Sequence, residues 1–108
     1  MSKPAANRTL EAQKIYALLA QIPEGSVTTY GDLAKAAGCP GGARAVGRIL
    51  NANPNLVIVP CHRVVKSDGS IGGYAGGIEM KKDLLKKEGV KCSSDRIERF
   101  DEIRAVLF

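Results

Sequence analysis

The chain has 108 residues, a length typical of one domain with a modest core. It carries 16 Lys and Arg against 11 Asp and Glu, a formal net charge of +5, and 44% of its residues are hydrophobic. This balance is typical of a soluble folded domain and excludes wholesale disorder. No apolar run approaches the roughly 20 residues of a membrane span, and residues 1–8 lack the apolar core of a secretory signal.

The chain has three cysteines, Cys39, Cys61 and Cys92, and one histidine, His62. An odd and sparse set of thiols favours a reducing compartment over a disulfide framework. We therefore expect a cytoplasmic protein, or a nuclear or nucleoid-associated one in a eukaryote. A single histidine excludes a multi-histidine metal site, and we expect no metal and no cofactor.

Basic charge is concentrated in the middle of the chain. Between Leu33 and Ser67 there are five basic residues and no acidic one. Such a stretch attracts a polyanion such as nucleic acid, but it is equally typical of an ordinary solvated face. The composition leaves both interpretations open.

After a loose leader at residues 1–8, helical spacing of apolar residues predicts a helix that is capped by Thr9 and runs to about Gln21. Its apolar stripe comprises Ile15, Leu18, Leu19 and Ile22. The β-prone segment 27–29 follows, and Thr29 is placed to cap a second helix with Asp32 in the third position.

The glycine-rich segment 38–42 predicts a turn, and a third helix is expected from Ala43 to Asn51. Ala43, Val46, Gly47 and Leu50 are expected on one face of it, with Arg44, Arg48 and Asn51 on the other. Two short helices joined in this way, the second presenting arginines, predict a helix-turn-helix.

Beyond this unit, the apolar run 56–59 predicts a short buried strand that ends at Pro60. The glycines of segment 71–77 predict a loop that allows close backbone approach. A last clear helix is expected over 78–87, and the mixed-charge tail 91–108 is expected to hold at most a short helix. The fold class predicted is a small α+β domain: a helix-turn-helix core, a short strand or hairpin, and a turn bearing Cys61.

Cys61 is the candidate nucleophile, because flanking His62 and Arg63 form an electropositive setting that favours a thiolate. The alternative is a buried structural cysteine, since unpaired cysteines are among the most buried residues. On an extended segment, His62 points away from its neighbour, so it needs a bend or a bridging water to act on Cys61.

Several motifs, in order, carry a resemblance to a known family. They are Tyr30-Gly31-Asp32-Leu33-Ala34, Arg44-Ala45-Val46-Gly47, Asn53-Pro54, Pro60-Cys61-His62-Arg63-Val64-Val65, Gly73-Tyr74-Ala75-Gly76-Gly77 and Leu84-Leu85-Lys86-Lys87-Glu88-Gly89. Over about residues 10–90 the chain resembles the DNA-repair alkyltransferases that act on O6-alkylguanine. The resemblance implies an alkyltransferase-like domain over 9–90 that flips a damaged guanine from double-stranded DNA and moves its alkyl group irreversibly onto Cys61.

The resemblance also implies roles for individual residues. His62 would act through a water as the base for Cys61 and be oriented by Glu88, while Asn53 would brace the turn. Tyr74 and the backbone N–H of Ala75 would bind the base, and the carbonyls of Cys61 and Val64 would select guanine. The implied substrate pocket comprises Leu50, Val64, Tyr74 and Ala75.

For DNA, the resemblance implies that the helix 43–51 lies in the minor groove and that the protein acts as a monomer, away from membranes. Arg44 would fill the space left by the flipped base, and Tyr30 would crowd the neighbouring phosphate. The remaining contacts implied are Ala43, Gly47, Arg48 and Asn51.

The size of the chain resembles a second branch, the alkyltransferase-like proteins, which carry tryptophan in place of the acceptor cysteine. These bind alkylated DNA without repairing it and pass it to nucleotide excision repair. This chain has no tryptophan and keeps Cys61, which favours the repairing branch, whereas many members of that branch carry an N-terminal domain for which this chain has no room. Some carry serine at the position of Ala75. A sequence-specific helix-turn-helix regulator is the third hypothesis.

Overall fold

A computed structural model describes residues 11–52 and 59–107 of the chain. Helix α2 (Ala12–Leu19) buries Ile15, Leu18 and Leu19. The predicted apolar stripe is therefore confirmed, and Ile22 of the following turn is buried as well. The predicted cap, Thr9, lies outside the described residues; α2 begins after Glu11, whose side chain makes no capping hydrogen bond.

Strand β1 (Thr28–Thr29) leads directly into helix α3 (Tyr30–Ala36). The hydroxyl of Thr29 accepts a hydrogen bond from the backbone N–H of Asp32 at 2.9 Å, so the predicted N-cap is confirmed. The carboxylate of Asp32 accepts two hydrogen bonds, each 2.9 Å long, from Arg104 in the tail. Because the capping residue also belongs to the strand, the position of Tyr30 at the start of α3 is set by both elements.

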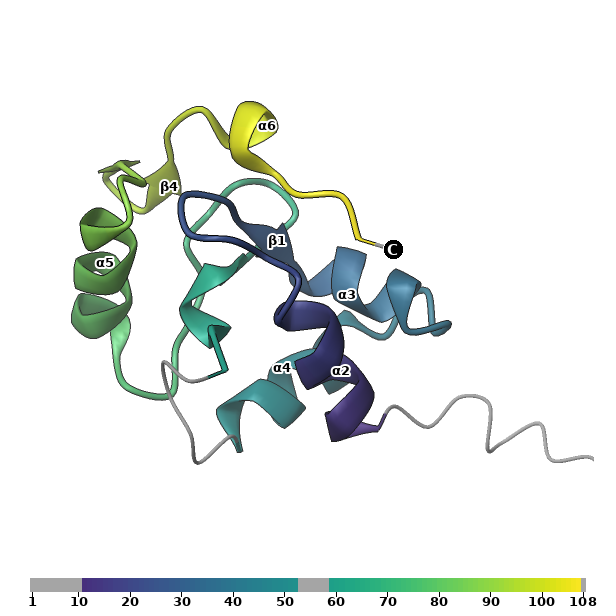
Figure 1. Ribbon diagram of the computed structural model, residues 1–108. Coiled ribbons are helices and arrows are strands. Elements are labelled where there is room, and N and C mark those ends of the chain that lie inside the picture. Colours follow the sequence, from purple (N-terminus) through teal and green to yellow (C-terminus); the bar gives the residue numbers. More distant parts are fainter. Residues whose placement is uncertain (1–10, 53–58, 108) are drawn as a thin grey trace, which may run out of the picture.

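A turn links α3 to helix α4 (Ala43–Asn51), which has the predicted bounds. Gly38 and Gly41 in this turn both adopt φ of +86°, a left-handed conformation that glycine takes without strain. Figure 1 shows α2, α3 and α4 gathered at one end of the molecule. The predicted helix-turn-helix is thus the α3–α4 pair, and α2 shares its hydrophobic core.

Cys61 lies in a short 3-10 helix, η1 (Cys61–Arg63), followed by strand β2 (Val64–Val65). Strand β2 pairs in parallel with β1, with Thr28 opposite Val64 and Thr29 opposite Val65. Successive side chains of a strand point to opposite faces, so Val64 joins the core cluster of α2, α3 and α4. Val65 joins a second core cluster on the other side.

Helix α5 (Ile78–Lys87) also has the predicted bounds and lies at the far side of the two-stranded sheet from α2 (Figure 1). The tail forms a β-hairpin of β3 (Cys92–Ser93) and β4 (Arg96–Ile97), then the short helix α6 (Phe100–Ile103). This hairpin was not predicted from the sequence. The fold class, a small α+β domain, is confirmed.

The tail packs along β1 and reaches α3. The N–H of Val27 donates to the carbonyl of Ile103 at 2.9 Å, and the N–H of Ala105 donates to the carbonyl of Val27 at 2.8 Å. Two hydrogen bonds therefore connect the tail to Val27, just before β1, and the Asp32–Arg104 ion pair connects it to the helix that carries Tyr30. None of the helices in the described ranges has the length and apolar character that a bilayer crossing requires.

Candidate active site

A pocket of about 420 Å³ opens between α4, the start of α3, the Cys61 turn and the glycine-rich loop after β2. This volume is within the roughly 300–1,000 Å³ of typical small-ligand sites. The residues that line it are Tyr30, Ala43, Arg44, Gly47, Leu50, Asn51, Cys61, Lys66, Ser67, Gly72, Gly73, Tyr74 and Ala75. The pocket thus brings together residues from four separate segments of the chain.

Cys61 is only 5% exposed, yet it lines the pocket. The predicted turn that carries it is a 3-10 helix closed by a 3.0 Å hydrogen bond from the N–H of Arg63 to the carbonyl of Pro60, so the segment is bent and not extended. The carbonyl of Cys61 accepts from the N–H of Val64. Pro60 has no N–H to donate to a strand ladder, which suits the start of a turn.

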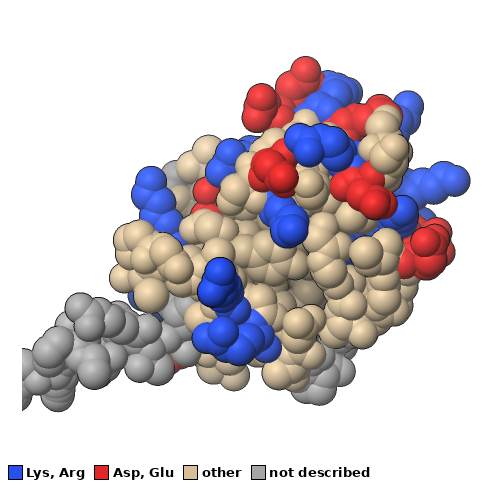
Figure 2. Space-filling view, turned by 180° about the vertical axis from the view of Figure 1, so that it is seen from behind, with Lys and Arg blue, Asp and Glu red and all other residues tan. Residues whose placement is uncertain are grey.

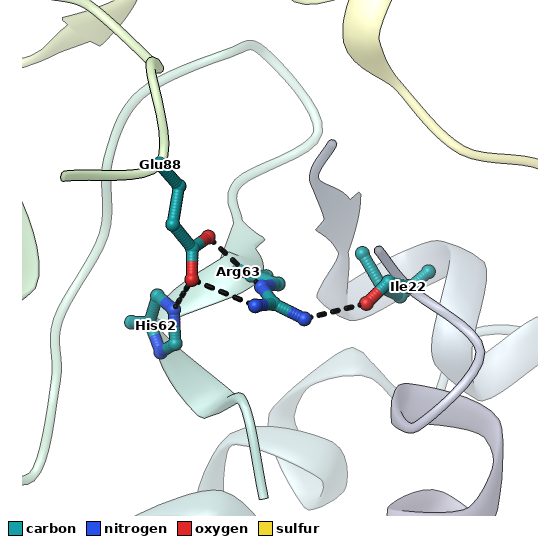
Figure 3. A network of polar contacts seen from close by, with 4 residues as sticks. All are labelled: Ile22, His62, Arg63 and Glu88. Atoms are coloured by element: carbon teal, nitrogen blue, oxygen red, sulfur yellow. Dashed lines mark hydrogen bonds and ion pairs between the residues drawn. The ribbon is translucent and has the colours of Figure 1, made fainter. Parts of the chain in front are cut away.

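Glu88 connects the two residues that follow Cys61. Its Oε2 lies 2.9 Å from Nε2 of His62 and accepts from Nη2 of Arg63 at 2.7 Å, while its Oε1 accepts from Nε of Arg63 at 2.9 Å. Nη1 of Arg63 donates to the carbonyl of Ile22 at 2.7 Å. Figure 3 shows the Glu88 carboxylate between the imidazole and the guanidinium, which joins α5, η1 and the end of the α2 segment.

This network decides which atom of His62 can accept a proton. A carboxylate only accepts hydrogen bonds, so with Glu88 ionised Nε2 of the neutral ring carries the hydrogen and Nδ1 carries the lone pair. Nδ1 is buried and has no hydrogen-bond partner within the described part of the chain. Burial acts to raise the pKa of Glu88, but hydrogen bonds from Arg63 and His62 outweigh it, so the pKa lies below its ordinary value.

The network also corrects one expectation about charge. The sequence analysis counted Arg63 in the electropositive setting of Cys61, but its guanidinium is paired with Glu88 and its side chain is only 14% exposed. The 3-10 turn rotates Arg63 toward α5, so its charge is balanced inside the protein. Between Leu33 and Ser67, four basic residues are left once Arg63 is set aside: Lys35, Arg44, Arg48 and Lys66.

Two tyrosines lie on the pocket wall. Tyr30 donates from its hydroxyl to the carbonyl of Gly73 at 3.3 Å, whereas the buried hydroxyl of Tyr74 has no partner among the residues described. Burial, and secondly the negative charge that Cys61 can carry, raise the pKa of both phenols. Both tyrosines therefore stay protonated and remain hydrogen-bond donors at neutral pH.

Helix α4 contributes one face to the pocket and another to solvent. Arg44 and Asn51 are exposed and line the pocket, whereas Arg48 is exposed but does not line it. Leu50 is buried in the core cluster and also reaches the pocket wall. Figure 2 shows basic side chains on the lower part of the rear face, at the level of α4, while most acidic ones on that face gather at the upper end.

Gly47 lies inside α4, where glycine costs about 1 kcal/mol relative to alanine. A Cβ atom built at Gly47 would meet nothing within 4 Å, so the packing of the protein does not require glycine there. Gly47 and Ala43 both line the pocket. The helix surface is therefore open to close approach from outside.

The remaining predicted residues are placed as follows. Ala75 lines the exposed rim of the pocket. Val64 does not line it, and its carbonyl accepts from Nζ of Lys81 at 2.7 Å. Asn53 and residues 56–58 of the predicted strand lie outside the described residues. Among the residues that are described, no group of three or more His, Cys, Asp or Glu could hold a metal ion.

Two features of the site were not predicted from the sequence: the burial of Lys81 and the pairing of Arg63. Lys81 is completely buried at the centre of the α5 face that packs on the protein, one turn before the buried Leu85. The signal was present in the sequence, because Ile78, Lys81 and Leu85 follow helical spacing and place a lysine where an apolar residue is expected. Nothing comparable in the sequence indicates the partner of Arg63.

Comparison with known proteins gives the family. Residues 11–90 match the family described as 6-O-methylguanine DNA methyltransferase, DNA binding domain. The chain belongs to this family. It spans about half the length of several of the curated relatives that it matches.

Two relatives and two solved structures show how similar this chain is to other members of the family. A methylated-DNA--protein-cysteine methyltransferase of Pyrobaculum aerophilum is 46% identical over 103 residues, 91% of this chain and 68% of that protein. One of Methanosarcina acetivorans is 45% identical and covers 81% of this chain and 56% of that protein. The Mycobacterium tuberculosis OGT structure in complex with DNA superposes with a TM-score of 0.70 at 45% identity, over 72% of this chain and 48% of that one.

The second structure differs from the first in how much of the chain it matches. S. pombe Atl1, in complex with damaged DNA containing O6-carboxymethylguanine, superposes with a TM-score of 0.73 at 31% identity. This match covers 97% of this chain and 98% of Atl1, so it includes nearly all of the tail beyond residue 90. The chain is thus more similar in sequence to the OGT structure, whereas a larger share of the chain superposes on Atl1.

Proposed function

We propose that this protein repairs O6-alkylguanine in DNA by transferring the alkyl group to the sulfur of Cys61. The observation that carries the proposal is the position of Cys61, which lines an open pocket together with Arg44 and two tyrosines. The residue after Cys61 is a histidine that is hydrogen-bonded to a carboxylate. The methylated-DNA--protein-cysteine methyltransferases that are 45–46% identical support this activity.

In the proposed reaction, the thiolate of Cys61 attacks the alkyl carbon in line with its bond to O6 of guanine. The sulfur–carbon bond forms as the carbon–oxygen bond breaks, and the electron pair of that bond remains on the guanine, which takes up a proton. The thioether cannot revert, so each molecule acts once.

His62 accepts the thiol proton of Cys61 through a bridging water. The carboxylate of Glu88 directs the hydrogen of His62 to Nε2, which leaves the lone pair of Nδ1 for this purpose. As the ring becomes positively charged, the adjacent carboxylate stabilises it. Arg63 keeps Glu88 ionised and in place, because its guanidinium binds both carboxylate oxygens.

The pocket wall binds the guanine. The hydroxyl of Tyr74, which has no partner among the described residues, donates to the base ring, and the N–H of Ala75 donates to O6 as charge develops there. The carbonyls of Cys61 and Val64 select guanine through its exocyclic amine. Each already accepts one hydrogen bond within the protein, and a carbonyl oxygen has a second lone pair for the base.

Double-stranded DNA lies along α4, with this helix in the minor groove and the protein acting as a monomer. Ala43 and Gly47 allow the helix to approach the groove closely, and Arg44 fills the space of the flipped base. Tyr30, at the pocket wall, crowds the adjacent phosphate. The M. tuberculosis OGT structure, which is a complex with DNA, supports DNA as the partner.

The test is to incubate the protein with an oligonucleotide containing O6-methylguanine and to measure the mass of the intact protein. We expect a gain of one methyl group per molecule, on Cys61, with no gain for Cys61→Ala. Tight binding to the lesion without a mass gain would instead support a lesion sensor that recruits excision repair. A preference for an undamaged sequence would support a transcriptional regulator.

A further inference from the structure

Lys81 has no part in the proposed reaction, yet it is completely buried on the inner face of α5. A buried amino group is costly unless its hydrogens find acceptors. Neighbouring Lys82 is only partly buried and pairs with Asp95, and Lys86 is exposed. The burial of Lys81 is therefore particular to this position and is not a general property of the helix.

Nζ of Lys81 donates to three backbone carbonyls, those of Val64 at 2.7 Å, Ile71 at 2.5 Å and Gly73 at 2.9 Å. An ammonium group has three hydrogens, so all of its donors are used. Burial lowers the pKa of Lys81 to about 7, and the charges of Cys61 and Cys92 oppose that shift. The neutral amine has only two hydrogens for the three carbonyls, so only the charged ammonium form can donate a hydrogen bond to each of them.

The three carbonyls belong to two segments that flank the pocket. Val64 directly follows the turn that carries Cys61, whereas Ile71 and Gly73 belong to the loop that leads into Tyr74. The carbonyl of Gly73 also accepts from the hydroxyl of Tyr30, and Nζ of Lys81 lies 6.0 Å from the centre of the Tyr30 ring. One amino group thus connects the nucleophile turn, the base-binding loop and the first residue of α3.

We propose that Lys81 is a positioning residue that fixes the distance between the Cys61 turn and the loop that carries Tyr74. This inference rests on the proposed function, because the distance matters only if a base is held by the loop while Cys61 attacks it. In-line displacement is sensitive to such geometry: a misplacement of about 1 Å can reduce a rate by about a hundredfold. The strands alone supply little constraint, since β1 and β2 have two residues each.

The test must separate positioning from an effect of the ammonium charge on thiol ionisation. We would measure two rates at the same pH for each protein: methyl transfer at saturating single-stranded oligonucleotide containing O6-methylguanine, and alkylation of Cys61 by iodoacetamide. Iodoacetamide needs the thiolate but not the loop. Single-stranded DNA avoids any contribution from opening a base pair.

For Lys81→Met, we expect the ratio of the methyl-transfer rate to the iodoacetamide rate to fall by about 10- to 100-fold. Lys81→Gln retains two N–H donors and should give a smaller fall, and it replaces Lys81→Met if that variant fails to fold. The matched control is Lys86→Met, an exposed lysine of the same helix, which should leave the ratio unchanged. Equal reductions in both rates, or no reduction, would overturn the positioning role.

Hydrogen–deuterium exchange tests the same inference without any reaction. We expect faster amide exchange in residues 72–77 of Lys81→Met and Lys81→Gln, with no change in α2. If the wild-type protein transfers no methyl group, the proposed function fails but exchange still decides the role of Lys81. Unchanged exchange in the loop would refute that role whatever the wild-type protein does.

Discussion

The arginines of α4 are exposed, whereas one basic side chain of η1 and one of α5 are largely buried and bonded to the protein. Arg44 and Arg48 lie on the surface of α4. Arg63 binds Glu88 and the carbonyl of Ile22, and Lys81 binds three carbonyls. The difference indicates two tasks: the exposed cations are available to a polyanion, and the buried ones hold the reacting groups in place.

The largest effect is expected from breaking the buried network at Glu88. Glu88→Ala leaves Arg63 without its carboxylate partner in a site where both side chains are less than 15% exposed, which should lower the free energy of unfolding by about 3–5 kcal/mol. It also removes the group that orients His62, so methyl transfer should slow by about 100-fold or more. Urea unfolding and single-turnover kinetics measure the two effects.

The matched control for Glu88→Ala is Glu79→Ala, which removes an exposed carboxylate from the first turn of the same helix. We expect it to change stability by less than about 0.5 kcal/mol, as for most surface substitutions. Normal transfer by Glu88→Ala at a temperature where the variant is folded would contradict the role of the network.

Arg44→Ala tests the role of the exposed arginine of α4 that lines the pocket. Because flipping a paired base costs a few kcal/mol, we expect the variant to slow transfer from duplex DNA by at least about tenfold. Transfer from a single strand should be nearly unchanged, since no base pair has to open. Arg48→Ala removes an arginine from the same helix that does not line the pocket, and at saturating DNA it should show no such difference between duplex and single strand. Equal losses on both substrates for Arg44→Ala would refute its role.

A smaller effect is expected on the salt dependence of binding to undamaged duplex DNA. If Arg48 contacts a phosphate, Arg48→Ala should reduce the slope of log K against log salt by about 0.9. Arg99 in the tail, which is exposed and paired with Glu102, provides the comparison. Titrations at several salt concentrations should show an unchanged slope for Arg99→Ala; a lower slope for that variant alone would place the DNA on the tail.

The smallest effect concerns the contact between the tail and α3. A hydrogen bond from Arg104 lowers the pKa of Asp32 against the opposing effect of burial. A carboxyl group whose pKa is lowered by folding stabilises the protein above its unfolded pKa, and this contribution is lost as the pH falls through the folded value. We therefore expect Asp32→Asn to be less stable than wild type by about 0.5–1 kcal/mol at pH 7.

This difference should begin to shrink as the pH falls below about 4, where the carboxyl group protonates in the unfolded chain, and it should be lost as the pH falls through the lowered pKa of the folded protein. Urea unfolding of both proteins between pH 7 and pH 3 measures it. Asp83→Asn, which removes an exposed carboxylate of α5, should remain close to wild type throughout. A difference between wild type and Asp32→Asn that is constant with pH would exclude the Asp32–Arg104 ion pair as its source.

The helices were predictable because their signals are local. The bounds of α4 and α5, and the cap of α3 by Thr29, follow from residues within a few positions of one another. The tail was not predictable in this way. Its strands have two residues each, too few to show an alternating pattern, so only their pairing with each other reveals them.

The sequence by itself determined the main helices, the helix-turn-helix and the likeness to the alkyltransferase family, and it indicated Cys61 as the candidate nucleophile. Only the tertiary structure decided how the buried charges are neutralised. Glu88 lies 25 residues from Arg63, and Lys81 lies 17 residues from Val64, whose acceptor is a backbone carbonyl. Every residue has such a carbonyl, so residue type says nothing about which one a lysine will reach; the parallel pairing of β1 with β2 and the packing of α5 settle it.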